Sequence, residues 1–207
     1  SKRRFCGCLN ALNMVTTRIS RNRQGTYYCL EEATLLHAYP RLRSDNMRLG
    51  MAVNCMKFLR ELQAEADGCS EGFALVDSLM DYLEVSETVN DLLPLFFRAR
   101  LLFEQGVGPT LGRCSGCGQE LEDALAAWVS ISQGQLFCAS CAGSTANLTP
   151  VGRETLNILA RISSCEPDKW SVLNPDNEVR AECCRIVDGF VSYHLGLEWD
   201  KSRYKRV

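Results

Sequence analysis

Four cysteines in the second half of the sequence have the spacing of a structural metal site. Cys114 and Cys117 form one CxxC pair, Cys138 and Cys141 form a second, and twenty residues separate the two pairs. Two intervening residues let both thiolates of a turn point at one ion, and two facing turns supply four sulfurs in a closed tetrahedron. We therefore predict one structural Zn²⁺ per chain, held by these four cysteines.

Other uses of the same cysteines are less favoured by the pattern. A redox dithiol needs only one CxxC pair, and an all-cysteine shell leaves no open position for the water of a catalytic zinc. Rubredoxin-like iron uses the same four ligands, so the spacing leaves iron open as an alternative. Gln133-Gly134 predicts the turn of a hairpin, formed by 128–131 and 136–137, that brings the second pair back over the first. The module would occupy about residues 107–146.

The remaining cysteines and the histidines predict no further chemistry. The chain has twelve cysteines. We expect most of the others to be small buried hydrophobic residues, namely Cys29, Cys55, Cys69, Cys165 and Cys183, and we assign Cys6 and Cys8 to packing on one face of a strand. His37 and His194 are interpreted as packed or surface residues. Since no nucleotide-binding loop, nucleophile elbow or HExxH helix is present, no catalytic residue is predicted.

The charge of the chain is unevenly distributed. Residues 1–30 contain six basic residues and no acidic one, whereas residues 31–200 hold all 25 acidic residues against 13 basic ones. This layout predicts an anionic partner at the ends of the chain, although a solvated surface gives the same count. The N-terminal candidates are Lys2, Arg3, Arg4, Arg18, Arg21 and Arg23, and the C-terminal ones are Lys201, Arg203, Lys205 and Arg206.

These residues must be positioned by two kinds of structure. Residues 1–30 contain two runs rich in β-branched and aromatic residues, 15–19 and 26–30, separated by a turn cluster that ends in Gly25, which predicts strands. From Glu31 onward apolar residues recur at helical spacing. The expected helices are one capped by Ser44 or Asp45, one that opens at Ser70 and buries Phe73, one from about Val89 to Gln105, one begun by Thr149-Pro150, and one after Asn174-Pro175-Asp176 that buries Tyr193.

The order of several motifs resembles the bacterial RecO family of recombination mediators. They include Phe96-Phe97-Arg98-Ala99-Arg100-Leu101-Leu102, then Gly106-Val107-Gly108-Pro109 and the two CxxC pairs, and finally Tyr193-His194-Leu195-Gly196. The opening Lys2-Arg3-Arg4-Phe5 and the later Glu31-Glu32-Ala33 look like the second half of that family's N-terminal oligonucleotide-binding (OB) barrel, which normally has about fifty further residues upstream. The expected fold is α+β: the last strands of an OB-type barrel (1–30), then a mainly helical domain (31–207) with the inserted zinc-ribbon-like module.

The resemblance implies a non-enzymatic DNA repair and homologous recombination factor of the cytoplasm and nucleoid, with no membrane partner. RecO-like proteins bind single- and double-stranded DNA, anneal complementary strands, and with RecR help load RecA on DNA coated by single-strand-binding protein (SSB), whose acidic C-terminal tail they bind. The six N-terminal basic residues would contact phosphates, while Phe5, Tyr27 and Tyr28 would stack on bases or belong to the barrel core. The alternative is a zinc-stabilised helical protein-interaction adaptor without DNA-binding activity of its own.

Overall fold

The computed structural model describes residues 5, 7–63, 70–121, 124–201 and 203–207. It divides the chain into two compact units, Ser1–Asn46 and Met47–Val207, which are treated separately below. No described helix is both long and apolar enough to cross a lipid bilayer.

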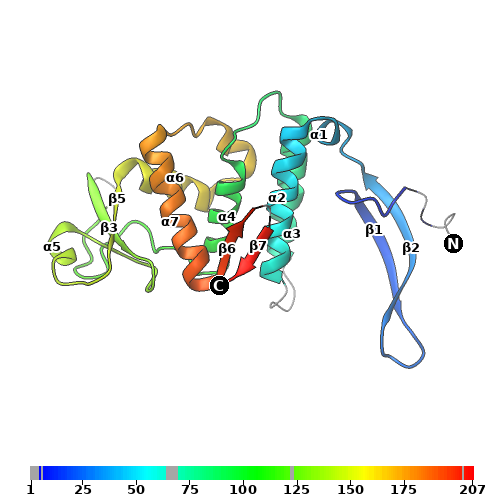
Figure 1. The fold of residues 1–207 in the computed structure, drawn as a ribbon, viewed down its shortest axis with the longest axis horizontal. Coiled ribbons are helices and arrows are strands. Elements are labelled where there is room, and N and C mark those ends of the chain that lie inside the picture. The colour runs from blue at the N-terminus through cyan, green and yellow to red at the C-terminus, as the bar shows by residue number, and fades with distance from the viewer. Residues whose placement is uncertain (1–4, 6, 64–69, 122–123, 202) are drawn as a thin grey trace. The chain divides into compact units, whose positions relative to one another are not determined.

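The sheet of the first unit is an antiparallel hairpin. Strand β1 (Met14–Arg21) pairs with β2 (Tyr28–His37), and Figure 1 shows the pair as a long twisted ribbon. The predicted turn is present: Gly25 has φ 69°, and the side-chain oxygen of Asn22 accepts hydrogen bonds from the backbone of Thr26 and Tyr27. Two strands were therefore correctly expected here.

The second strand is longer than the sequence indicated. The helical pattern expected from Glu31 starts only at helix α1 (Pro40–Ser44), so the predicted boundary at residue 30 falls inside β2. Pairing with β1 holds residues 31–37 in an extended conformation, because cross-strand contacts outweigh the weak helical periodicity of apolar residues in this segment. Cys8 lies in a turn instead of on the predicted strand, and Cys6 lies outside the described residues.

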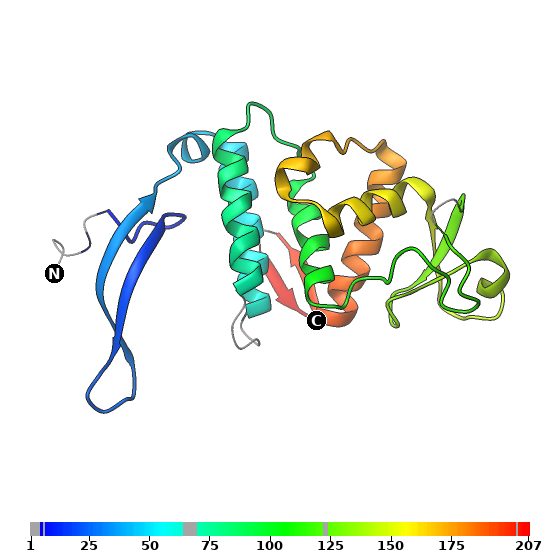
Figure 2. The same ribbon diagram turned by 180° about the vertical axis from the view of Figure 1, so that it is seen from behind.

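The second unit is built around one central helix. Helix α4 (Leu93–Glu104) contacts the later helices α6 (Arg153–Ser164) and α7 (Asn177–Leu195). In Figures 1 and 2 it lies between these helices and the earlier pair, α2 (Asn46–Gln63) and α3 (Ser70–Val85). Pro94 is in its first turn, and Gly106, with φ 69°, follows its end.

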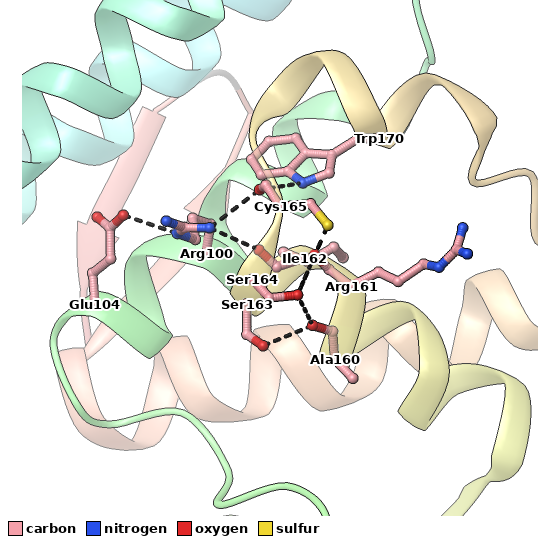
Figure 3. A network of polar contacts seen from close by, with 9 residues as sticks. All are labelled: Arg100, Glu104, Ala160, Arg161, Ile162, Ser163, Ser164, Cys165 and Trp170. Carbon is pink, nitrogen blue, oxygen red and sulfur yellow. Dashed lines mark hydrogen bonds and ion pairs between the residues drawn. The ribbon is translucent and has the colours of Figure 1, made fainter. Parts of the chain in front are cut away.

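A short 3₁₀ helix, η1 (Pro167–Val172), contributes the largest buried side chain of the core. Trp170 is fully buried and meets the ring of Phe96 edge to face, with centroids 6.3 Å apart. Its indole nitrogen donates to the carbonyl oxygen of Cys165 (3.1 Å), and Arg100 of α4 donates to the same oxygen (3.1 Å). Figure 3 shows these contacts converging on the C-terminal end of α6. The positive charge of Arg100 is stabilised there by the negative, C-terminal end of the α6 dipole.

The ends of two other helices are satisfied by side chains. Asp176 caps α7 by accepting hydrogen bonds from the backbone of Glu178 and Val179 (both 2.9 Å), as its place before the apolar pattern predicts. Arg48 of α2 is buried and donates to the carbonyl oxygens of Leu83 (2.5 Å) and Glu87 (3.0 Å) at the end of α3. A buried cation in this position satisfies carbonyls that the helix leaves without partners.

Three sequence-based assignments in this unit were wrong. Thr149 and Pro150 belong to strand β5 (Thr149–Gly152), and α6 starts only at Arg153. Proline is tolerated there because β5 lies at the edge of its sheet, where a missing N–H costs no ladder bond. Phe73 and Tyr193, expected in the core, are 59% and 63% exposed.

Two small sheets complete the second unit. The first has the order β4-β3-β5, with β3 (Ala126–Ser130) between β4 (Gln135–Phe137) and β5. The second is a C-terminal hairpin of β6 (Leu197–Asp200) and β7 (Arg203–Arg206). The fold is thus α+β and mostly helical with an inserted four-cysteine module, as predicted. The described part of the first unit contains a two-stranded sheet only.

The isolated cysteines largely pack as expected. Cys55 and Cys183 are buried, and Cys29 and Cys165 are partly buried; Cys69 lies outside the described residues. Burial raises the pKa of Cys183 to about 11 and raises that of Cys55 as well, so both are neutral thiols at physiological pH. These cysteines contribute to packing in the helical core.

Candidate metal centre

The first CxxC pair lies in a tight loop that depends on two glycines. The backbone N–H of Gly118 donates to the carbonyl of Cys114 (2.8 Å), and Gly118 has φ 76°, a conformation that glycine adopts without strain. A Cβ added at Gly116 would lie 2.9 Å from Cys141 Sγ. Both glycines are therefore required by the geometry: one makes the turn, and the other lets the second pair approach.

The second CxxC pair follows the predicted hairpin. Strands β3 and β4 pair antiparallel, and Gly134 in their turn has φ 63°. Cys138 comes directly after β4, and Cys141 lies in the single-turn helix α5 (Ala139–Ala142). The loop of the first pair is joined to this hairpin by a hydrogen bond from Ser115 N to Leu136 O (2.8 Å). The hairpin thus brings the second pair back to the first, as the sequence predicted.

The four sulfur atoms form one cluster. The ligand atoms of Cys114, Cys117, Cys138 and Cys141 all lie within 4.8 Å of one another, and the Sγ atoms of Cys117 and Cys138 are 3.8 Å apart. Four sulfurs in a tetrahedron around one zinc ion, each at about 2.3 Å from it, would be about 3.8 Å apart. The cluster therefore has the dimensions of a closed four-sulfur metal site.

The electrostatics of the cluster favour a bound cation. Burial opposes ionisation of Cys114, but the backbone N–H groups of Cys138, Cys117 and Gly116 outweigh it and lower its pKa to about 6. The neighbouring thiols raise the pKa of Cys141 to about 12, and the thiol of Cys138 has the largest effect. Four thiolates this close repel one another, so they ionise together only around a positive charge. The donor set thus fits a structural metal ion.

The module is fixed to the helical body by a contact that the sequence did not reveal. His194, near the end of α7, donates from Nε2 to the carbonyl oxygen of Ile131 in the β3–β4 turn (2.7 Å). Its ring stacks on Phe190 (centroids 5.5 Å apart), and a Cβ added at Gly189 would lie 3.3 Å from the side chain of Ile131. His194, expected to be a packed or surface residue, is packed and helps to position the cysteine module. The other histidine, His37, is exposed on β2.

The candidate DNA-binding residues lie in different surroundings. Lys2, Arg3 and Arg4 lie outside the described residues. Arg18 forms ion pairs across the hairpin with Glu31 (3.7 Å) and Glu32. The charge of Arg18 is therefore offset by acidic residues of β2.

The other two arginines of the hairpin are at its far end. The guanidinium of Arg21 donates to the hydroxyl of Tyr28 (2.8 Å) and lies 5.1 Å from the centre of its ring. Arg23, in the turn, is exposed and forms no ion pair within the described residues. Tyr27 and Tyr28 are 61% and 65% exposed. The turn therefore combines two cations with two exposed aromatic rings.

Comparison with known proteins gives consistent matches over the whole chain. Residues 43–204 match the family model described as recombination protein O C terminal. The DNA repair protein RecO of Nitratidesulfovibrio vulgaris (strain DP4) is 40% identical over 210 residues, which cover 100% of this chain and 84% of that protein. The DNA repair proteins RecO of Oleidesulfovibrio alaskensis and Lawsonia intracellularis are 36% and 31% identical, with the same two coverages.

Proposed function

Since the chain belongs to the RecO family of DNA repair proteins, we propose that it binds DNA, anneals complementary strands and, with RecR, helps load RecA on SSB-coated single-stranded DNA. The observation that carries this proposal is the 40% identity to a DNA repair protein over the full length of the chain. The role is a binding role, and no catalytic group is assigned to it.

We propose zinc as the metal of the four-cysteine centre, with a structural role. Its support is the all-sulfur donor set and the closed arrangement, in which Cys114 and Cys138 are buried. Zinc would hold the module at about residues 107–146 on the helical body of the second unit and would take no part in chemistry. Iron in the same ligand set is the alternative that elemental analysis distinguishes.

We propose that the N-terminal strands are the last part of an OB-like barrel, which the sequence places at 1–30. The exposure of apolar side chains on the hairpin, including Ile19 (57%) and Leu35 (42%), supports this proposal. An isolated hairpin is marginally stable in water, and apolar residues on its faces are expected to pack on further strands. Such a barrel would present its basic turn and strands to nucleic acid.

The first test is the salt dependence of DNA binding. Each phosphate that is neutralised releases condensed counterion, so affinity for single strands should fall with salt at a logarithmic slope of about 0.7 per contact. Changing Lys2, Arg3 and Arg4 together to alanine should lower the slope by about two. The measurement is fluorescence anisotropy of a labelled oligonucleotide across a salt series. Arg18, Arg21 and Arg23 are the next set to change.

A matched control comes from the second unit. Arg60, Lys169 and Arg185 are exposed basic residues, and their triple change to alanine removes the same charge without touching the proposed surface. If both triple variants leave affinity and slope unchanged, Lys2, Arg3 and Arg4 serve only to keep a sheet edge soluble. If the unaltered chain binds no oligonucleotide, it is better described as a zinc-stabilised adaptor.

We also propose the acidic C-terminal tail of SSB and RecR as protein partners, the tail binding to the helical domain. Support comes from family membership. A synthetic tail peptide should be retained by the immobilised chain at micromolar concentration, and the same peptide with its acidic residues changed to neutral amides should not. Retention of neither peptide would contradict the proposed partner.

A further inference from the structure

Cys117 differs from the other cysteines of the cluster in its access to solvent. Among the cysteines that the structure describes it is the exposed one, whereas Cys114 and Cys138 are buried and Cys141 is partly buried. The two glycines that flank Cys117 are exposed as well, and they carry no side chain that could cover its sulfur. A small reagent in solution therefore reaches this sulfur before the other three.

A buried cysteine of the other CxxC pair lies within reach of Cys117. The Sγ atoms of Cys117 and Cys138 are 3.8 Å apart. A disulfide bond is about 2.0 Å long, so the two sulfur atoms need to approach each other by about 1.8 Å to form one. The glycines on both sides of Cys117 give its backbone the freedom for such a shift. The exposed sulfur thus has a partner with which it can form a disulfide.

Both sulfurs are thiolates when the centre holds the proposed structural ion. A cysteine binds a metal only after it has lost its proton, and the thiolate is the form of cysteine that attacks peroxides and other electrophiles. Oxidation is favoured at a cysteine that is a thiolate, is accessible to solvent and lies next to a second cysteine that can form a disulfide with it. Cys117 combines these three properties.

We propose that Cys117 is a peroxide-reactive modification site and that Cys138 converts its oxidised form into a disulfide. The Cys117 thiolate attacks one oxygen of hydrogen peroxide, the O–O bond breaks and hydroxide leaves, so Cys117 becomes a sulfenic acid. The Cys138 thiolate then attacks this sulfur, forms the S–S bond and expels a second hydroxide. The two thiolates together lose two electrons, and one peroxide is reduced to two hydroxides. The inference rests on the proposed structural metal and adds a regulation of the same centre.

Oxidation changes one part of the cysteine module and preserves another. It leaves Cys114 and Cys141 as the remaining thiolates, which are too few for a closed four-ligand site. The carbonyl oxygen of Cys141 accepts hydrogen bonds from the hydroxyls of Ser144 (2.9 Å) and Thr145 (3.3 Å), so the segment 139–146 is organised around this ligand. This segment loosens when the metal leaves. Strands β3 and β4 stay joined to the first loop, because the disulfide still links the two CxxC pairs.

The test treats the metal-loaded chain with hydrogen peroxide. The bound metal should pass to a chromogenic chelator, with about one ion released for each disulfide formed, since every disulfide removes two ligands. Peptide mass spectrometry without reduction should find the bond between Cys117 and Cys138, and dimedone, which traps sulfenic acids, should label Cys117 first. Amides of 139–146 should then exchange faster, while those of β3 and β4 stay protected. A disulfide between Cys114 and Cys117 would overturn the role of Cys138.

Two variants separate this site from the proposed metal and from a general effect of peroxide. Cys117→His keeps four ligands, because three cysteines and one histidine also form closed zinc sites, so it should retain the metal in peroxide. Cys165→Ser changes a partly buried cysteine outside the cluster and should respond like the unaltered chain.

The outcomes that contradict the proposal are distinct. If the unaltered chain holds no metal, the proposed metal centre and this site both fail. If the metal is bound and peroxide neither modifies Cys117 nor releases the metal, only this site fails. If Cys117→His does not take up metal, the order of dimedone labelling in the unaltered chain decides, and labelling of Cys114 or Cys141 before Cys117 overturns the proposal.

Discussion

Changing Cys114 to serine should abolish metal binding at the four-cysteine centre and unfold the module at about residues 107–146. The side chain is buried, and its sulfur accepts a hydrogen bond from the backbone N–H of Cys138 (3.3 Å), so a hydroxyl can replace neither the ligand nor the packing. Binding of structural zinc contributes roughly 10 kcal/mol or more to the folding of small zinc-finger peptides. Loss of one ligand should therefore remove most of the module's stability.

The measurements are elemental analysis and hydrogen exchange. The unaltered chain, purified without added metal, should contain one equivalent of zinc. In the Cys114→Ser variant, amides of β3 and β4 should exchange first, while those of α4 stay protected, because the buried core around α4 and Trp170 is made by the helical body. Acid should also release the metal from the unaltered chain, since protons compete for the four thiolates.

A second cysteine variant tests whether the loss of metal is specific to the four-cysteine cluster. Cys165 is a partly buried cysteine outside the cluster, and Cys165→Ser should keep the full metal content. Iron in place of zinc would contradict the proposed metal. Undiminished metal in Cys114→Ser would contradict the four-sulfur site. A loss of helical circular dichroism over the whole chain would mean that the module also organises the helical body.

Changing Trp170 to alanine should give the largest loss of stability from a single change in the helical core. Trp170 is fully buried, packs against Phe96 and donates a hydrogen bond to Cys165 O. The carbonyl oxygen of Trp170 also accepts a hydrogen bond from Asn90 (3.2 Å). Truncation of a buried tryptophan typically costs about 3–5 kcal/mol, from lost burial and from the cavity left behind.

Urea unfolding followed by circular dichroism measures this effect. Val172 belongs to the same 3₁₀ helix but is 70% exposed, so Val172→Ala should change the free energy of unfolding by less than about 0.5 kcal/mol. Both variants should keep the full metal content, because neither residue belongs to the cysteine module. A cost below about 1 kcal/mol for Trp170→Ala would show that η1 is not an integral part of the core.

Several features followed from the sequence because short-range chemistry fixes them. The CxxC spacing brings each pair of sulfurs to one turn, and Gly134 marks the hairpin that joins the pairs. Pro94 and Asp176 mark helix starts through a preset backbone angle and a side-chain cap. Each of these signals depends on residues within about four positions of one another.

Other features were decided by contacts between distant residues, which the sequence does not display. Strand β2 runs on to His37 because β1 supplies its hydrogen-bond partners, and Thr149-Pro150 joins β3 as an edge strand instead of starting a helix. Tertiary structure also brings Arg18 into ion pairs with Glu31 and Glu32, and it places His194 against the carbonyl of Ile131, 63 residues away. Such partners meet only after folding, since burial and hydrogen bonding in three dimensions outweigh the local preferences that a sequence pattern records.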